Sequence, residues 1–315
     1  MTTHNQITLN SWLSVAALGL VWGGTFLVIE LALVTMTPFW IASARIGFAT
    51  VLTTLIWRAM GGRLWLSKDS AWGGLLVVGA LSTAVPFMLL SWGQQYVTSG
   101  FAGVSMAAVA LLVLPLAHVF VPGDAMTLRR TVGFLIGFVG VVILIGGQAF
   151  ESSGAVLETP GRIACVGAAC CYAVSSVVMR RLPPIDPIGL AAMPLLIGSA
   201  LVIPTAVYVE GAPAMPDLRT LGILAFLGLV PTAGANFLRV YVIRTAGPVF
   251  MSLVNYQVPL WSVLLGALLL SEPLPQSLVL ALVLILAGLG VSQYGPLSRL
   301  FRSTRHRVKG RVRGQ

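Results

Sequence analysis

The chain has 315 residues, of which 57% are hydrophobic and only 9% are charged, and its formal net charge is +10. Soluble globular domains carry about a quarter of their residues as Asp, Glu, Lys or Arg. A surface this poor in charge excludes a water-soluble fold and predicts an all-α integral membrane protein. Cys165, Cys170 and Cys171 lie in one apolar stretch, and we expect them to be small packing residues.

Ten apolar stretches are long enough to cross a bilayer as helices, which takes about 20 residues. The short connections between them leave no room for a soluble domain. A removable signal peptide is not expected, because residues 1–10 contain no Lys or Arg. In chain order, the predicted spans are residues 11–33, 38–58, 72–96, 99–121, 127–148, 160–180, 187–208, 219–243, 246–270 and 274–297.

Charged residues predict how these spans are oriented. Cytoplasmic loops carry an excess of Lys and Arg. Basic residues gather at alternate span ends, namely Arg58, Arg63, Lys68, Arg129, Arg130, Arg180, Arg181 and Arg244. The opposite ends carry Glu151, Glu158, Glu210, Asp217 and Glu272. This pattern predicts a bacterial inner (plasma) membrane protein with both termini in the cytoplasm.

The chain ends in a basic tail, residues 298–315, in which the last seventeen positions carry seven basic residues. Beside a membrane span, such a tail is expected to be a disordered cytoplasmic anchor. Contact with anionic lipid headgroups is the alternative, and nucleic-acid binding is not expected.

The two halves of the chain share a pattern. An Ala-Gly pair, eleven further residues and a proline occur at Ala102–Pro115 and again at Ala246–Pro259. Because each half holds five spans, the second half must enter the membrane upside down relative to the first. The sequence therefore predicts two inverted five-helix repeats, residues 1–148 and 149–297, around a central cavity.

Several motifs resemble those of the drug/metabolite transporter superfamily, in its ten-span EamA branch. They are WGGTF at Trp22–Phe26, Pro38 followed by Arg45, and PLWSVLLGALLLSEPL at Pro259–Leu274. The resemblance covers nearly the whole chain, and the chain is most similar to bacterial exporters of aromatic amino acids and paraquat. It implies alternating access and export of small organic solutes. One departure is Glu30, where most members of the family keep a lysine.

Polar and aromatic residues near the middle of several spans predict a substrate cavity with neutral hydrogen-bonding groups and aromatic walls. For each residue alone, a structural bond between helices is an equal alternative. Together they favour a zwitterionic or polar ligand with an apolar, aromatic body. The candidate substrate-binding residues are Trp22, Thr25, Phe87, Ser91, Gln95, Tyr172, Ser175, Ser176, Asn236, Asn255 and Tyr256.

Small residues and prolines in the spans indicate close packing and bending. Gly23 and Gly24 either let a neighbouring helix approach closely or make room for a substrate. Pro86, Pro231 and Pro259 lie near span centres, where a proline frees a carbonyl and bends the helix. We expect these three prolines to serve alternating access.

The ionisable residues inside predicted spans include Glu30, near the extracellular end of the first, and Arg45, two turns into the second. They are expected to form a structural or gating ion pair, in preference to a site for a substrate carboxylate. A carboxylate is missing from the middle of every predicted span, which favours facilitated uniport. A proton-coupled exporter of cationic drugs and a channel are the alternatives.

An enzyme is not expected, because the sequence contains no HExxH motif, no nucleotide-binding P-loop and no paired catalytic carboxylates. The histidines are His4, His118 and His306, two of them in the tails, so neither a metal site nor a cofactor is predicted. The expected partners are a small-molecule substrate, such as an amino acid, and the membrane lipids.

Overall fold

The protein is described here by a computed structural model that covers residues 7–61, 70–121, 125–146, 157–183 and 187–312. Within these residues all regular structure is helical, and ten spans are long and apolar enough to cross a membrane. The first five spans are α1 (Leu9–Leu33), α2 (Pro38–Ala59), α3 (Ser70–Gly79) with η1 (Ala80–Ala84) and α4 (Val85–Gly93), α5 (Ser99–Phe120) and α6 (Leu128–Gly146).

The second half has the same order of spans. They are α7 (Glu158–Arg181), α8 (Pro187–Glu210), α9 (Leu218–Leu227) with η3 (Gly228–Gly234) and α10 (Ala235–Ala246), α11 (Pro248–Met251) with α12 (Val254–Leu269), and α13 (Gln276–Val312). The predicted all-α fold with ten spans is therefore confirmed.

Short polar caps fix where several helices begin. The Thr98 hydroxyl accepts a hydrogen bond from the Phe101 amide at 3.2 Å, at the start of α5. The Asp217 carboxylate accepts one from the Thr220 amide at 2.8 Å, at the start of α9. Hydrogen bonds from Thr220 lower the pKa of Asp217, which lies just outside the span. These caps satisfy amide groups that a helix start would otherwise leave without acceptors.

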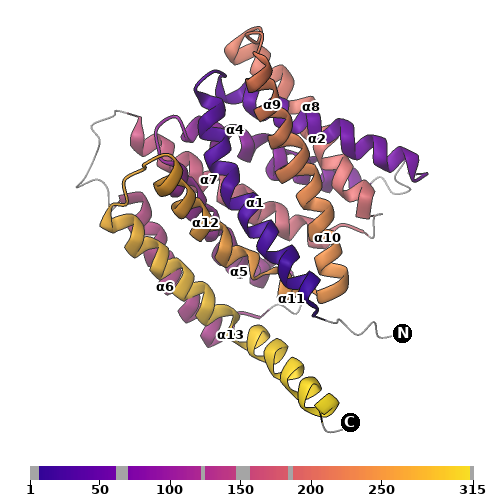
Figure 1. Cartoon of the computed structure of the whole chain (residues 1–315), viewed down its shortest axis with the longest axis vertical. Helices are drawn as coiled ribbons and strands as arrows, with labels where there is room; N and C mark the ends of the chain where they lie inside the picture. Colours follow the sequence, from indigo (N-terminus) through magenta and orange to yellow (C-terminus); the bar gives the residue numbers. More distant parts are fainter. Residues whose placement is uncertain (1–6, 62–69, 122–124, 147–156, 184–186, 313–315) are drawn as a thin grey trace.

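The helices pack mainly across the two halves of the chain. Helix α2 packs against α8, α5 against α12, and α6 against α13 along most of its length (Figure 1). Helix α1 packs on α12, and α7 packs on α5. Because these pairs join the first half to the second, the two halves interlock in one bundle.

The bundle has two chemically different ends. The start of α1 and the end of α13 lie at the same end (Figure 1). We call this the basic end, since the spans carry Arg58, Arg129, Arg130, Arg180 and Arg244 there. The opposite end, at the end of α1, is the acidic end and carries Glu30, Glu210, Asp217 and Glu272.

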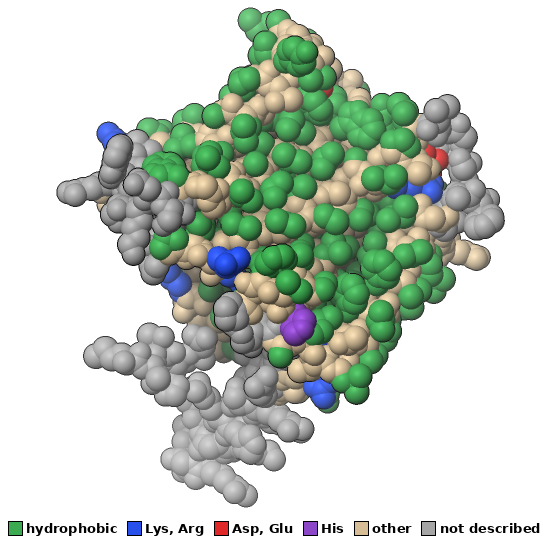
Figure 2. All heavy atoms as spheres, turned by 180° about the vertical axis from the view of Figure 1, so that it is seen from behind, with side chains coloured by type: hydrophobic (Ala, Val, Ile, Leu, Met, Phe, Trp, Pro, Cys, Tyr) green, Lys and Arg blue, Asp and Glu red, His purple; other side chains and the backbone are tan. Residues whose placement is uncertain are grey.

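The outer surface between these ends is apolar. Figure 2 shows one face covered by hydrophobic side chains, with few charged groups among them. Among the described residues, large apolar side chains such as Val51 and Leu55 are more than half exposed. In water such a surface would be unfavourable, but it suits contact with lipid chains.

Helix α13 is longer than predicted. The basic tail was expected to be disordered, whereas α13 continues as a helix to Val312. Arg, Lys and Leu are good helix formers, so the helix can continue beyond the apolar part of the span.

The three spans that contain central prolines all have irregular backbones. Pro86 follows the π-helical segment η1 by two residues, and Pro231 lies within the π-helical segment η3. In the ninth span the break is a turn at Ser252 and Leu253 between α11 and α12, and Pro259 lies further on, inside α12. The irregularity expected at Pro86 and Pro231 is therefore present, at corresponding spans of the two halves.

Glycines bring the backbones of α6 and α13 into contact. A Cβ atom at Gly133 would lie 2.6 Å from the Ser292 amide nitrogen, well inside a normal contact distance of about 3.5 Å. A Cβ atom at Gly140 would lie 3.0 Å from the Ala281 carbonyl oxygen. By contrast, a Cβ atom at Gly290, also on α13, would meet no described atom within 4 Å.

This contact can be tested by one pair of variants. We expect Gly133→Val to lower the free energy of unfolding by about 1–3 kcal/mol, because the two backbones must move apart. Gly290→Val should change it by less than about 0.5 kcal/mol. Thermal denaturation of the purified protein in detergent measures both effects. Equal stability of the two variants would show that α6 and α13 do not pack in this way.

Candidate substrate site

A buried arginine lies between α2, α4 and η3. Arg45 is only 8% exposed, and its Nε donates a hydrogen bond to the Thr232 hydroxyl at 2.8 Å. Its guanidinium carbon lies 3.9 Å from the centre of the Phe87 ring, which is a cation–π contact. Tyr172 on α7 is close enough to act on Arg45 electrostatically. Three spans from the two halves therefore meet at one cation.

The predicted ion pair between Glu30 and Arg45 is not formed. Arg45 faces Phe87 and Thr232, whereas Glu30 interacts with Gln94 and with the charge of Glu272. Helix α1 packs mainly on α12, while α2 packs mainly on α8, so the two side chains point to different neighbours. Within the described part of the chain, Arg45 forms no salt bridge to a carboxylate.

Thr232 is held by the backbone defect that Pro231 creates. Proline lacks an N–H, so the Leu227 carbonyl four residues earlier loses its usual helical donor. The Thr232 hydroxyl donates to that carbonyl at 2.9 Å and also accepts the bond from Arg45. Thr232 is not among the residues predicted for the site, although its position directly after a central proline is a signal for it.

Trp22 binds the same segment from α1. Its indole Nε1 donates a hydrogen bond to the Pro231 carbonyl at 2.9 Å, and its side chain is half-buried. Asn236 donates from its amide nitrogen to the Thr232 carbonyl at 2.6 Å. Of the predicted residues, Trp22 and Asn236 thus bond to η3, whereas Phe87 and Tyr172 lie beside Arg45.

The two glycines of the first span have different environments. A Cβ atom at Gly23 would lie 2.5 Å from the Cβ of Trp261 on α12, so Gly23 allows close helix packing. A Cβ atom at Gly24 would lie 3.4 Å from its nearest neighbour, a side-chain carbon of Leu265, which is an ordinary contact. Thr25 is buried and donates to the Val21 carbonyl of its own helix at 2.8 Å.

The remaining hydroxyl candidates have mixed surroundings. Ser91 and Ser175 are buried, and Ser176 donates to the Tyr172 carbonyl at 2.7 Å. The buried hydroxyl oxygen of Tyr256 has no hydrogen-bond partner among the described residues. The structure gives none of these side chains a contact with Arg45.

Two of the predicted amides are exposed. Gln95 was expected to share a helical face with Ser91, but α4 ends at Gly93, so helical spacing no longer applies. The buried amide is its neighbour Gln94, which is 2% exposed. Asn255 was expected in the cavity and is also exposed.

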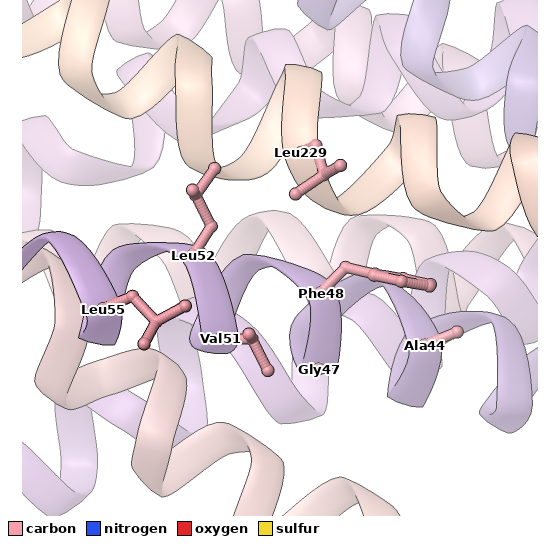
Figure 3. A pocket seen from close by; sticks show the side chains of 7 residues that line it. All are labelled: Ala44, Gly47, Phe48, Val51, Leu52, Leu55 and Leu229. Atoms are coloured by element: carbon pink, nitrogen blue, oxygen red, sulfur yellow. The ribbon is translucent and has the colours of Figure 1, made fainter.

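A separate apolar pocket of about 500 Å³ lies along α2 and η3 (Figure 3). Arg45, Phe87 and Tyr172 are not among its lining residues. It offers no polar side chain to orient an amino acid, and it suits a hydrocarbon chain. Its lining residues are Ala44, Gly47, Phe48, Val51, Leu52, Leu55 and Leu229.

Carboxylates at the acidic end join helices of the two halves. Glu272, just after α12, accepts hydrogen bonds from the Ser99 and Gly100 amides at 2.8 and 3.0 Å, at the start of α5. Glu210, at the end of α8, accepts from the Phe39 and Trp40 amides and the Thr37 hydroxyl, at the start of α2. A carboxylate at a helix N-terminus is favourable, so both contacts hold helix ends together.

Ten apolar spans, two of which contain π-helical segments near their middle, and one of these segments bonded to a buried cation, form an architecture known from membrane transport proteins. A sequence model of the EamA-like transporter family matches residues 10–146 and 159–293. The chain therefore belongs to the EamA-like transporter family.

Curated relatives of the chain are named as transporters. An uncharacterized transporter of Archaeoglobus fulgidus is 26% identical over 287 residues, covering 89% of this chain and 98% of the relative. The uncharacterized inner membrane transporter YedA of Escherichia coli is 28% identical over 273 residues, covering 85% and 86%. A probable amino-acid metabolite efflux pump of Salmonella typhimurium is 25% identical over 296 residues, covering 87% and 92%.

One protein of known crystal structure is similar in fold. It has a TM-score of 0.64 and 20% sequence identity, over 90% of this chain and 96% of that chain. At this identity the likeness concerns the fold alone.

The Trp22 hydrogen bond to η3 can be tested directly. We expect Trp22→Phe to destabilise the protein by about 1 kcal/mol, because the Pro231 carbonyl loses its donor. Trp261→Phe is the control, since its indole N–H makes no hydrogen bond to a described residue. Melting temperatures in detergent compare the two variants. A Trp22→Phe variant no less stable than the control would argue against this bond.

Proposed function

We propose that the protein is a secondary transporter that exports aromatic and other neutral amino acids by alternating access. The observation that carries this proposal is the environment of Arg45. Its Nε is bonded to Thr232, while its other N–H groups have no acceptor among the described residues. A buried charge without a counterion is costly, and a substrate carboxylate would supply that counterion. Arginine binds carboxylates well because its N–H groups can form two parallel hydrogen bonds.

The surroundings of Arg45 suit an aromatic amino acid. Phe87 lies against the guanidinium, Tyr172 on α7 lies close by, and the half-buried Trp22 on α1 binds the neighbouring Pro231 carbonyl. A substrate ring would pack among these aromatic groups. The side-chain oxygen of Asn236 is available to accept a hydrogen bond from the substrate ammonium group, because its nitrogen already donates to Thr232.

Alternating access would use the two halves, 1–148 and 149–297, as inverted repeats. If the halves are repeats, α1 corresponds to α7, α12 to α5, α2 to α8, and η3 to η1. The contact of α1 with α12 then has its counterpart in that of α7 with α5, and the contact of α2 with η3 has its counterpart in that of α8 with η1. All four contacts occur. The two stretches that match the family also divide the chain near this boundary. The irregular segments at Pro86 and Pro231 would be the bending points.

The proposed membrane topology is supported by the distribution of charge, and the proposed direction of transport is supported by the name of a relative. The charge asymmetry between the basic and acidic ends supports cytoplasmic termini. An inner membrane location agrees with the printed name of the Escherichia coli relative, and export agrees with that of the Salmonella relative. Uniport was expected because the spans have no central carboxylate.

The main alternative, export of cationic drugs such as paraquat, fits the site less well. A dication near Arg45 would meet a buried like charge rather than a counterion. A channel is a further alternative. A carrier should show saturable counterflow of labelled phenylalanine in liposomes, whereas uptake through a channel would not be accelerated by unlabelled phenylalanine on the far side.

The role of Arg45 can be tested by calorimetric binding to the purified protein. We expect Arg45→Gln to weaken phenylalanine binding about 10- to 100-fold, because a charge-assisted hydrogen bond is lost. Binding of phenylalaninol, which lacks the carboxylate, should be unchanged. Arg58→Gln at the basic end is the control and should bind both ligands normally. Equal loss for the two ligands, or no loss for phenylalanine, would reject Arg45 as the carboxylate site.

A further inference from the structure

A cluster of buried and half-buried oxygen atoms lies near the acidic end, apart from Arg45. It is formed by Glu30 on α1, Gln94 directly after α4, Ser99 at the start of α5 and the half-buried Glu272 after α12. Four spans meet here, two of which, α5 and α12, are tied together by Glu272.

Three oxygens of this cluster have no hydrogen-bond partner among the described residues. They are Glu30 Oε2, Gln94 Oε1 and Ser99 Oγ. Gln94 and Ser99 are almost completely buried, with 2% and 0% of their surface exposed. The Gln94 nitrogen already donates to the Phe26 carbonyl at 2.8 Å, one turn before Glu30, so its oxygen remains as an unpaired acceptor. Buried acceptors without donors are costly.

The two carboxylates differ in what stabilises their charge. Glu272 accepts hydrogen bonds from two backbone amides at a helix N-terminus, which favours its charged form. Glu30 has no such backbone donors: its Oε2 has no hydrogen-bond partner among the described residues, although the Gln94 side chain lies close enough to act on the carboxylate. The packing places the two groups at one level of the bundle. A Cβ atom at Gly103 on α5 would lie 3.2 Å from the Phe26 ring, one turn before Glu30, and a Cβ atom at Gly266 on α12 would meet both Ser99 Oγ and the Glu272 carboxylate. Two like charges at such a half-buried site disfavour each other.

Other charged or titratable groups also lie on the helices around α1. The charged or titratable residues on helices that pack against α1 are Tyr256 on α12, His118 on α5, Arg219 on α9, Arg45 and Arg58 on α2, and Arg239, Tyr241 and Arg244 on α10.

We propose that Glu30 and Glu272 form a proton-binding site that controls opening of the acidic end. A proton on Glu30 supplies the missing donor, which Gln94 Oε1 or Glu272 can accept, and it removes the repulsion between the carboxylates. The protonated pair then holds α1, α5 and α12 together, as in this structure. Loss of the proton restores two adjacent negative charges and favours separation of these helix ends.

This inference deepens the proposed function, since opening of the acidic end would be one step of alternating access. It makes transport sensitive to the pH at the acidic end of the bundle. It does not depend on the identity of the solute, so the two proposals can fail separately.

The test measures the distance between two spin labels at the acidic end as a function of pH, without any solute. Val34 and Leu274 are exposed and carry the labels, in a variant whose three cysteines are replaced by alanine or serine. Double electron–electron resonance on the protein in lipid nanodiscs gives the distance distribution. In the labelled parent protein, we expect a single short distance at low pH and a growing longer population as the pH rises.

Glu30→Gln should keep the short distance at every pH, because an amide can donate a hydrogen bond but cannot lose a proton. Glu210→Gln is the matched control, since Glu210 ties the other pair of helices at the same end, and it should respond to pH as the parent does. If Glu30→Gln does not fold, Glu30→Asp should retain the response with a displaced midpoint. A parent distribution that does not change with pH, or a Glu30→Gln variant that responds as the parent does, would overturn the proposal.

Discussion

The buried guanidinium of Arg45 is the constraint on which the site depends. In a bilayer, a charge without partners is expensive, so the surrounding chain must supply them. Phe87 covers one face of the guanidinium and Thr232 accepts one hydrogen bond. Thr232 is positioned in turn by the hydrogen bond from its hydroxyl to the Leu227 carbonyl, for which Pro231 cannot act as the usual helical donor. Three spans are thereby fixed around one charge that still has hydrogen-bonding capacity for a ligand.

The remaining contacts explain how a bundle can be tight in some places and adjustable in others. Helices α6 and α13 touch through glycine backbones, which favours a rigid contact. At the acidic end, by contrast, Glu210 and Glu272 join helices through hydrogen bonds to exposed helix starts. Such polar contacts can exchange with water more easily than packed backbones can separate. Movement is therefore expected at the acidic end and at the π-helical segments rather than between α6 and α13.

The sequence predicted the spans well, because length and apolar content alone define a helix that crosses lipid. It predicted side-chain partners less well. Gln95, rather than the buried Gln94, was predicted to face the cavity because the helix was expected to continue to residue 95. Helix α4 in fact ends at Gly93. The pairing of Glu30 with Arg45 assumed that helices adjacent in sequence also face each other, whereas each packs mainly on a helix of the other half. Such long-range choices are set by tertiary packing, which periodicity does not encode.

The central claim, that Arg45 is the counterion of a substrate carboxylate, can be measured as a contact. Solid-state NMR of the reconstituted protein, with ¹⁵N-labelled arginine and phenylalanine ¹³C-labelled at its carboxyl carbon, reports whether the two groups are close. We predict a dipolar coupling between the carboxyl carbon and a guanidinium nitrogen that disappears in Arg45→Gln. Bound phenylalanine without this coupling, or with a coupling that survives in Arg45→Gln, would contradict the account.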